Sequence, residues 1–142
     1  WVSKKNIPII ILTNQSGIAR GYFTEKVFYE VQKFIIELLR QEGVNIKAFF
    51  HCPYHPEAEI EAYKGYSLLR KPEAGMLLKA LETYPCDLNK SLMIGDKTSD
   101  KLNIHSLNTV LIGTHKIKES KKVKVFDCHS KLKTYFQIFF KS

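Results

Sequence analysis

Short apolar runs that each end in a polar loop constrain the fold of this chain more than any other feature. Residues 8–13 and 91–95 are two such runs, and polar residues follow each of them directly. Between Thr24 and Gly43, apolar side chains instead recur every three or four residues, as on one face of a helix. Strands that alternate with helices predict a three-layer α/β domain, a Rossmann-like parallel sheet with right-handed crossovers.

The remaining elements continue this alternation. Strands are expected at 48–52, 109–112 and 123–126, and helices at 72–84, after 100 to about 107, and at 130–140. The helix that Thr24 caps should be amphipathic, with one apolar face made of Val27, Val31, Phe34, Ile35, Leu38 and Leu39. Residues 14–22 and 53–70 lack a period and are predicted to be loops. The second is long enough to be a lid over a site.

Length and composition indicate one globular domain over residues 1–142. Of the 142 residues, 44% are apolar and 25% are charged. No apolar run approaches the roughly 20 residues that cross a bilayer, so we expect a cytoplasmic protein without a membrane partner. Cys52, Cys86 and Cys128 are scattered, and reduced thiols are expected. We expect the protein to be a monomer.

The net charge of +8 lies mostly at the C-terminal end. Residues 114–142 hold eight lysines against Glu119 and Asp127, whereas the preceding 113 residues carry a net charge of only +2. A lysine-rich end without interleaved arginine and aromatic residues is typical of a solvated surface. Nucleic-acid binding is therefore a weak alternative.

Three polar segments lie where predicted strands end or a helix begins. They are residues 13–17, 70–72 and 95–100. Each alone could be a turn, a solvated pair or a helix cap. Together they offer a hydroxyl and backbone amides for phosphate oxygens, a fixed cation, and a carboxylate for a divalent metal. Because ligands of parallel sheets bind beyond the carboxyl ends of the strands, this combination favours phosphoryl chemistry.

The same segments resemble a known family. The string from Thr13 to Gly21, Phe23-Thr24, Arg70-Lys71-Pro72, Gly75-Met76 and Gly95-Asp96-Lys97 are similar to motifs of the heptose-bisphosphate phosphatases of the haloacid dehalogenase (HAD) superfamily. Histidinol-phosphate phosphatases are related to these enzymes. The resemblance spans residues 8–113. It implies a magnesium-dependent phosphatase in which one aspartate attacks phosphorus and a second, two residues later, acts as acid and base.

The resemblance also implies roles for particular residues. Thr13 would hydrogen-bond the transferring phosphoryl group, and Lys71 would tie the phosphoryl oxygens to the nucleophile. Asp96 would bind Mg²⁺, and Asp100 would orient either Lys71 or a metal-bound water from the outer shell. The neighbouring backbone amides of Asn14, Gln15 and Ser16 would help Thr13 to hold the transferring phosphoryl group. Arg70 would grip the distal part of a sugar phosphate, and Lys97 would contact the substrate.

The family's opening motif, a strand followed by Asp-x-Asp-Gly-Thr, has no counterpart in the sequence. It should lie some forty residues before Thr13, and only twelve residues precede Thr13 here. We therefore expect an N-terminally truncated HAD domain that does not turn over phosphate esters. The missing strand would lie between the strands that end at Thr13 and Gly95, and unpaired backbone groups cost about 1–3 kcal/mol each when buried. A longer protein or another chain is expected to supply it.

A structural zinc ion, which many relatives hold in the long loop, is not expected. The resemblance places its ligands in a Cys-Pro-His-His segment and a later Cys-x-Cys. Here the loop reads Cys52-Pro53-Tyr54-His55, with Ser67-Leu68-Leu69 later, so only Cys52 matches one of about four donors. His51, Cys52 and His55 are then loop or packing residues. The former zinc loop would be held by packing of Tyr54, Tyr63 and Tyr66, or it would be mobile.

The function that the resemblance implies is hydrolysis of a small phosphorylated sugar. The expected reaction converts D-glycero-heptose 1,7-bisphosphate to the 1-phosphate through a phosphoaspartyl intermediate, in the synthesis of lipopolysaccharide or capsule. Histidinol phosphate or another small phosphomonoester remains an alternative substrate. A different alternative is an inactive remnant that serves as a binding or assembly module.

Overall fold

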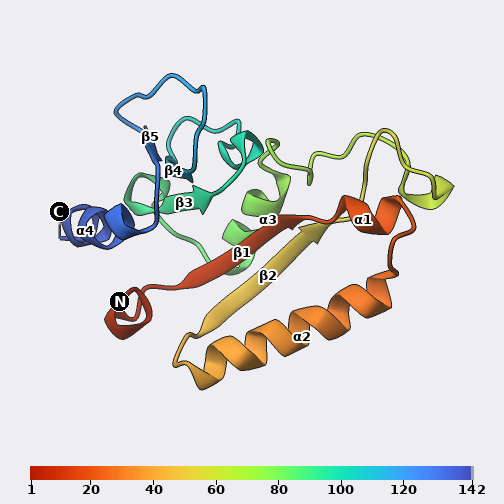
Figure 1. The fold of residues 1–142 in the computed structure, drawn as a ribbon, viewed down its shortest axis with the longest axis horizontal. Helices are drawn as coiled ribbons and strands as arrows, with labels where there is room; N and C mark the ends of the chain where they lie inside the picture. Colours follow the sequence, from red (N-terminus) through yellow and green to blue (C-terminus); the bar gives the residue numbers. More distant parts are fainter. Residues whose placement is uncertain (142) are drawn as a thin grey trace.

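Two parallel sheets form the centre of the structure, a computed structural model that describes residues 1–141. In the first sheet, β1 (Ile9–Asn14) pairs with β2 (Ile46–Cys52). In the second, β4 (Asn108–Ile112) pairs with β3 (Leu92–Gly95) on one side and β5 (Val123–Phe126) on the other. Every ladder is parallel, which confirms the predicted α/β class (Figure 1).

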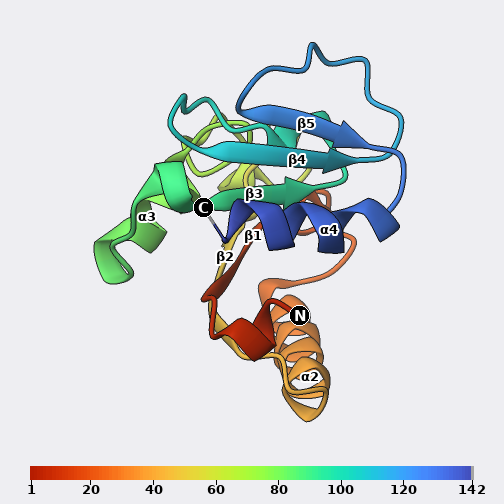
Figure 2. The ribbon, with the colours of Figure 1, turned by 90° about the vertical axis from the view of Figure 1, so that its left-hand side faces the viewer.

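Helices connect and flank these strands. They are α1 (Ser16–Ala19), α2 (Glu25–Gln41), α3 (Gly75–Thr83) and α4 (Ser130–Phe139), with 3₁₀ turns η1 (Ser3–Lys5), η2 (Glu61–Tyr63), η3 (Leu88–Lys90) and η4 (Thr98–Asp100). In the two ribbon views α2 lies beside the first sheet, and α4 lies beside the second (Figures 1 and 2). Thr24 caps α2 as predicted, because its side chain accepts a hydrogen bond from the Val27 amide at 3.3 Å.

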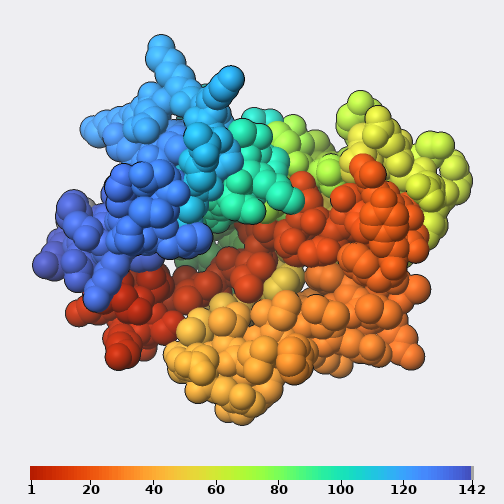
Figure 3. All heavy atoms as spheres, viewed as in Figure 1, coloured from red at the N-terminus to blue at the C-terminus, as the bar shows by residue number. Residues whose placement is uncertain are grey.

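The two sheets are separated between β1 and β3. Each of these strands has a partner on one side only within residues 1–141. All six residues of β1 are half-buried although four are large and apolar, and the Ile94 side chain of β3 is 39% exposed. In the space-filling view β1 is visible between α2 and the C-terminal segment (Figure 3). This arrangement agrees with the expected absence of a strand between those ending at Thr13 and Gly95.

The best-buried core lies in the second sheet. Val110 and Leu111 of β4 are fully buried because strands flank β4 on both sides. Met76 and Ala80 of α3 are also buried. The core therefore concentrates beside the strand that has both of its neighbours.

The amphipathic helix predicted after Thr24 forms as α2, but its apolar face is largely exposed. Phe34 is 65% exposed, and Val27, Val31, Ile35 and Leu38 are each at least 40% exposed. The buried residue is instead Phe28, whose ring lies 6.0 Å from the Phe49 ring of β2. A sheet of two strands is too narrow to cover the whole apolar stripe of a 17-residue helix.

Several element boundaries also differ from the prediction. Residues 16–19 of the expected loop form α1, and β2 begins at Ile46 rather than at 48. The helix expected from Pro72 begins at Gly75. The helix expected before Leu107 is wrong: only the η4 turn forms, because the Asn103 amide donates to the Pro72 carbonyl at 2.8 Å instead of to its own segment.

None of the helices within residues 1–141 combines the length and the apolar character needed to cross a bilayer.

Candidate functional site

The end of β1 and the segment before α3 are joined by one side chain, that of Asn14. Its Nδ2 donates to the Lys71 carbonyl at 3.0 Å, and its Oδ1 accepts from the Lys71 amide at 2.9 Å. This two-point contact uses both a donor and the acceptor of the Asn14 side-chain amide. Asn14 therefore holds the backbone of Lys71 at the carboxyl end of β1.

The Lys71 ammonium connects β1 to the segment that follows β3. Its Nζ donates to the Leu12 carbonyl at 2.8 Å and forms an ion pair with Asp100. The Lys71 side chain is 11% exposed and that of Asp100 is 4% exposed, so the pair is buried. Asp100 also accepts from the Lys97 amide at 2.9 Å. Of the two roles predicted for Asp100, the ion pair fits the one in which Asp100 orients Lys71.

A glycine is required at the end of β3 for this pairing. A Cβ atom on Gly95 would overlap the Asp100 side chain, carboxylate included. Asp100 can therefore fold back over the strand end only because residue 95 has no side chain. The missing side chain at Gly95 therefore leaves room for the Asp100 carboxylate that pairs with Lys71.

Asp96 lies at the same sheet edge and is available to a ligand. It is exposed, and within residues 1–141 its carboxylate forms neither a hydrogen bond nor an ion pair. Carboxylate oxygens are ligands that Mg²⁺ prefers, and Mg²⁺ commonly takes one or two of them while keeping water. No group of three or more potential metal ligands occurs among the described residues. Asp96 is therefore free to supply one carboxylate ligand to a divalent cation.

Thr13 and Gln15 form a second part of the site, with one correction. The Gln15 side chain donates to the Thr13 hydroxyl at 3.0 Å, which leaves the hydroxyl hydrogen of Thr13 able to donate to an anion. The Gln15 backbone amide, however, donates to the Cys52 carbonyl at 2.8 Å. The prediction that this amide contacts a phosphoryl group is therefore wrong. Ser16 begins α1 next to these residues.

Arg70 lies against the first residues of the lid. One of its guanidinium nitrogens donates to the Tyr54 carbonyl at 3.2 Å. Burial lowers the pKa of the neighbouring His55 below its usual 6.5, and the positive charges of Arg70 and Arg20 lower it further. The sequence analysis did not predict that the Arg20 charge acts on the lid, although Arg20 belongs to the motif Thr13 to Gly21.

A cluster of Glu25, His51 and Tyr63 joins α2, β2 and the lid, and the sequence analysis did not anticipate it. The Glu25 carboxylate lies 3.1 Å from His51 Nε2 through one oxygen and accepts from the Tyr63 hydroxyl at 3.1 Å through the other. His51 also packs on Phe28, with ring centroids 4.6 Å apart, in agreement with its predicted packing role. No local sequence pattern links three residues so far apart in the chain.

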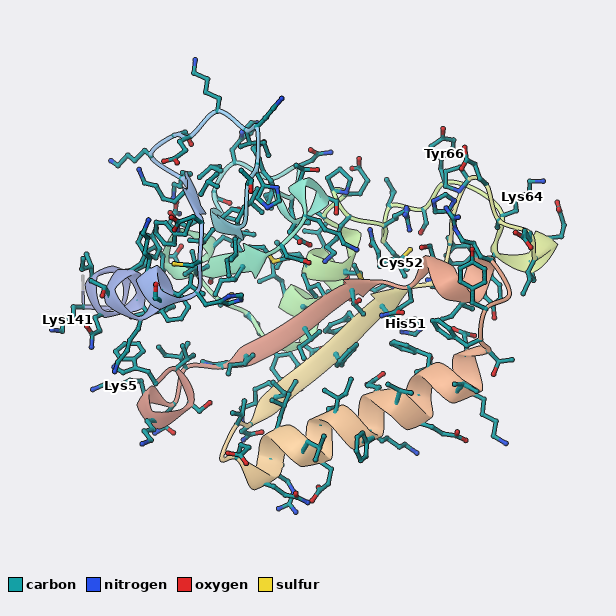
Figure 4. The ribbon with its side chains drawn as sticks, viewed as in Figure 1. Lys5, His51, Cys52, Lys64, Tyr66 and Lys141 are labelled. Carbon is teal, nitrogen blue, oxygen red and sulfur yellow. The ribbon has the colours of Figure 1, made fainter. Side chains whose placement is uncertain are left out.

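Of the three lid tyrosines predicted to pack together, two do so. The rings of Tyr54 and Tyr63 meet edge to face at a centroid distance of 6.1 Å. Tyr66 is 94% exposed and points away from the lid, so its predicted packing role is wrong (Figure 4). Gly65, with a φ of 138°, turns the chain outward just before Tyr66.

Comparison with known structures defines the class of this fold. A HAD-like phosphatase from Mesorhizobium loti superposes with a TM-score of 0.83 at 31% identity, over 98% of this chain and 69% of that one. The D,D-heptose 1,7-bisphosphate phosphatase of B. bronchiseptica, solved with magnesium and phosphate, superposes with a TM-score of 0.78 at 22% identity, over 99% of this chain and 79% of that one. The chain therefore has the fold of the HAD-like phosphatases.

Sequence comparison gives the family. The profile of the polynucleotide kinase 3 phosphatase family matches residues 2–141, and the chain belongs to this family. The D-glycero-beta-D-manno-heptose-1,7-bisphosphate 7-phosphatase of Photorhabdus laumondii is 40% identical over 99 residues, which are 70% of this chain and 53% of that protein. The chain thus spans about half the length of the curated relatives it matches.

Proposed function

We propose that residues 1–142 form the phosphate-handling part of a HAD-type phosphatase that removes one phosphate from a sugar bisphosphate. D-glycero-heptose 1,7-bisphosphate is the proposed substrate and the 1-phosphate its product. The observation that carries this proposal is the buried Lys71–Asp100 pair next to the exposed carboxylate of Asp96. The family match and the names of the relatives support the same chemistry.

In this proposal the described residues bind and orient the substrate. The Thr13 hydroxyl donates to a phosphoryl oxygen, and the Lys71 ammonium, held by Asp100 and Leu12, offsets the negative charge that develops during transfer. Asp96 would hold Mg²⁺, which when bound would neutralise phosphate charge. The amides of Asn14 and Ser16 would help Thr13 to hold the phosphoryl group, whereas Arg70 and Lys97 would contact the rest of the sugar phosphate.

The attacking aspartate is proposed to come from outside residues 1–142. Neither acidic residue of the site can replace it, since Asp100 is buried and paired with Lys71 and Asp96 is the proposed metal ligand. The open edges of β1 and β3 face the place where a strand carrying Asp-x-Asp would pair with both. That strand would also place its carboxylates beside Thr13, Lys71 and Asp96.

The test of this function uses the complete open reading frame that carries residues 1–142. We expect magnesium-dependent phosphate release from heptose 1,7-bisphosphate, with slower release from histidinol phosphate. In that protein, Lys71→Ala and Asp96→Asn should each lower kcat/KM by roughly two to three orders of magnitude. Lys71→Ala removes the positive charge that offsets the transferring phosphate, and Asp96→Asn weakens the proposed Mg²⁺ site.

The matched control is Lys101→Ala, which removes an exposed lysine next to Asp100 and should leave the rate unchanged. Because Lys71→Ala leaves a buried carboxylate unpaired and can unfold the protein, the Asp96→Asn result decides the assignment if Lys71→Ala is insoluble. Wild-type turnover in Asp96→Asn would contradict the proposed metal role. Faster release from histidinol phosphate would replace the proposed substrate.

A further inference from the structure

The lid, residues 53–70, contacts the rest of the domain at two main places. The first is α1, where the Ala19 carbonyl accepts from the Glu59 and Ile60 amides at 3.0 Å each. The second contact is made by Tyr63. Its carbonyl accepts from the His55 amide at 3.1 Å, and its ring contacts the Tyr54 ring. Its hydroxyl donates to Glu25 at 3.1 Å, which is the contact that reaches α2. Tyr63 therefore links the beginning of the lid loop to its later part and to α2.

Glu25 is itself held in place from the other side. Its second carboxylate oxygen lies 3.1 Å from His51 Nε2, and the His51 side chain is 14% exposed. The His51 ring is clamped by Phe28, at 4.6 Å, and by Tyr29, at 5.4 Å. Because His51 belongs to β2, the Glu25 carboxylate fixes Tyr63 with respect to the sheet as well as to α2. We call Glu25, His51 and Tyr63 the Glu25 latch.

The donor atoms of this loop do not fit a structural zinc ion. His51 is paired with Glu25, the buried Cys52 thiol donates to the Tyr54 carbonyl at 4.0 Å, and His55 Nδ1 accepts from the Glu57 amide at 3.1 Å. A tetrahedral site needs about four N or S donors directed at one point. The three candidates are instead each directed at a different protein partner.

We infer that the Glu25 latch fixes the lid to α2 and β2 through hydrogen bonds, without a metal ion. A carboxylate that accepts from two donors forms charge-assisted hydrogen bonds, which are stronger than neutral ones. Glu25 is 37% exposed, so solvent weakens these bonds without removing them. Glu25 and Tyr63 therefore order the part of the lid around residue 63, next to the backbone bonds that tie Glu59 and Ile60 to Ala19.

The latch also positions Arg70. Tyr63 packs against Tyr54, and the Tyr54 carbonyl accepts from the Arg70 guanidinium at 3.2 Å. Glu25 and Tyr63 are thus positioning residues for Arg70, and this second step rests on the proposed function of Arg70 in gripping the distal part of the substrate. Loss of the latch should weaken substrate binding and leave the chemical step unaffected.

Limited proteolysis of the complete protein tests the latch. Lys64 follows Tyr63 directly, and its half-exposed side chain is accessible to trypsin. The Lys64 and Gly65 amides donate to the Glu61 and His55 carbonyls at 3.1 Å, so trypsin should cut at Lys64–Gly65 only when this backbone opens. Tyr63→Phe removes one hydroxyl and should raise the initial cutting rate at this bond roughly tenfold. The matched control is Tyr66→Phe, which removes a hydroxyl from the exposed lid tyrosine and should leave the rate unchanged.

A double-mutant cycle and a metal assay complete the test. Glu25→Ala should raise the cutting rate as Tyr63→Phe does, and the double variant should add little, because both changes break the same bond. EDTA should not alter the wild-type rate. Equal rates in Tyr63→Phe and Tyr66→Phe would overturn the latch. So would one tightly bound zinc ion per chain whose removal opens the lid.

The kinetic readout separates the latch from the proposed function. With heptose 1,7-bisphosphate, Tyr63→Phe should raise KM severalfold at constant kcat, whereas Tyr66→Phe should change neither. If Tyr63→Phe is cut faster but its KM is unchanged, the inference that the latch fixes the lid stands, and the inference that it positions Arg70 is overturned. A protein without phosphatase activity but with the expected cutting rates would contradict the proposed function and not the latch.

Discussion

At the scale of single residues, the site depends on a few polar side chains that other side chains hold in place. Asn14 fixes the backbone of Lys71 through two hydrogen bonds, and Asp100 fixes its ammonium. The sequence analysis identified Lys71 and Asp100 by resemblance but assigned Asn14 only a backbone role. The identity of an amide side chain does not reveal whether it binds a ligand or another part of the chain, since its geometry suits both.

His55 provides a titration test of the charges near the lid. Burial and the two arginines lower its pKa, so the folded state resists protonation more than the unfolded state does. Stability should therefore fall as the pH drops below 6.5, where the unfolded chain takes up the proton. Arg70→Gln should raise the pKa of His55 toward 6.5, as measured by NMR of the ring protons.

The control for this titration is Lys33→Gln, which removes an exposed charge from α2 and should not shift the His55 resonance. An unchanged pKa of His55 in Arg70→Gln would contradict the placement of the guanidinium beside the imidazole.

At the scale of elements, periodicity found the strands and the longer helices but not what covers them. The stripe on α2 has the spacing of a core-facing surface, yet most of its apolar residues are exposed. Spacing reports that a face is apolar, whereas burial also requires a neighbouring element wide enough to cover it. For the short segment 101–107, the predicted helix itself does not form. A hydrogen bond to the Pro72 carbonyl replaces the helical one there, since the helical preference of so short a segment is weak.

The N-cap of α2 offers a prediction at this scale. Thr24→Ala removes the side-chain oxygen that accepts from the Val27 amide and should lower the free energy of unfolding by about 1 kcal/mol. Urea unfolding of the complete protein followed by circular dichroism measures this change. Thr24→Ser, which keeps the oxygen, should retain most of the stability, and a loss equal to that of Thr24→Ala would argue against the cap.

At the scale of the whole molecule, the division of the sheet is the dominant feature. Within residues 1–141, β1 pairs only with β2 and β3 pairs only with β4, and the best-buried core lies around β4, which has a strand on both sides. The resemblance predicted this gap, since the motif missing from the sequence belongs to a strand at that position. Apolar residues on both open edges would become buried if a strand filled the gap.

Hydrogen exchange can test whether such a strand is present in the complete protein. In residues 1–142 alone, about every second amide of Ile9–Leu12 faces the gap and should exchange quickly, because parallel strands direct their amides alternately to either side. In the protein from the complete open reading frame, these amides should exchange at least tenfold more slowly. Identical exchange in the two samples would show that no strand pairs with β1 there.

The sequence by itself determined the α/β class, the order of the strands and the polar segments at their ends, because these depend on local periodicity and on short motifs. Only the tertiary structure decided which partners those residues have. The Lys71–Asp100 pair spans 29 residues along the chain, the Asn14–Lys71 contact 57 and the Glu25–Tyr63 bond 38. Contacts of this kind form when the packing of separate elements brings side chains within about 3 Å, and no spacing in the sequence encodes that distance.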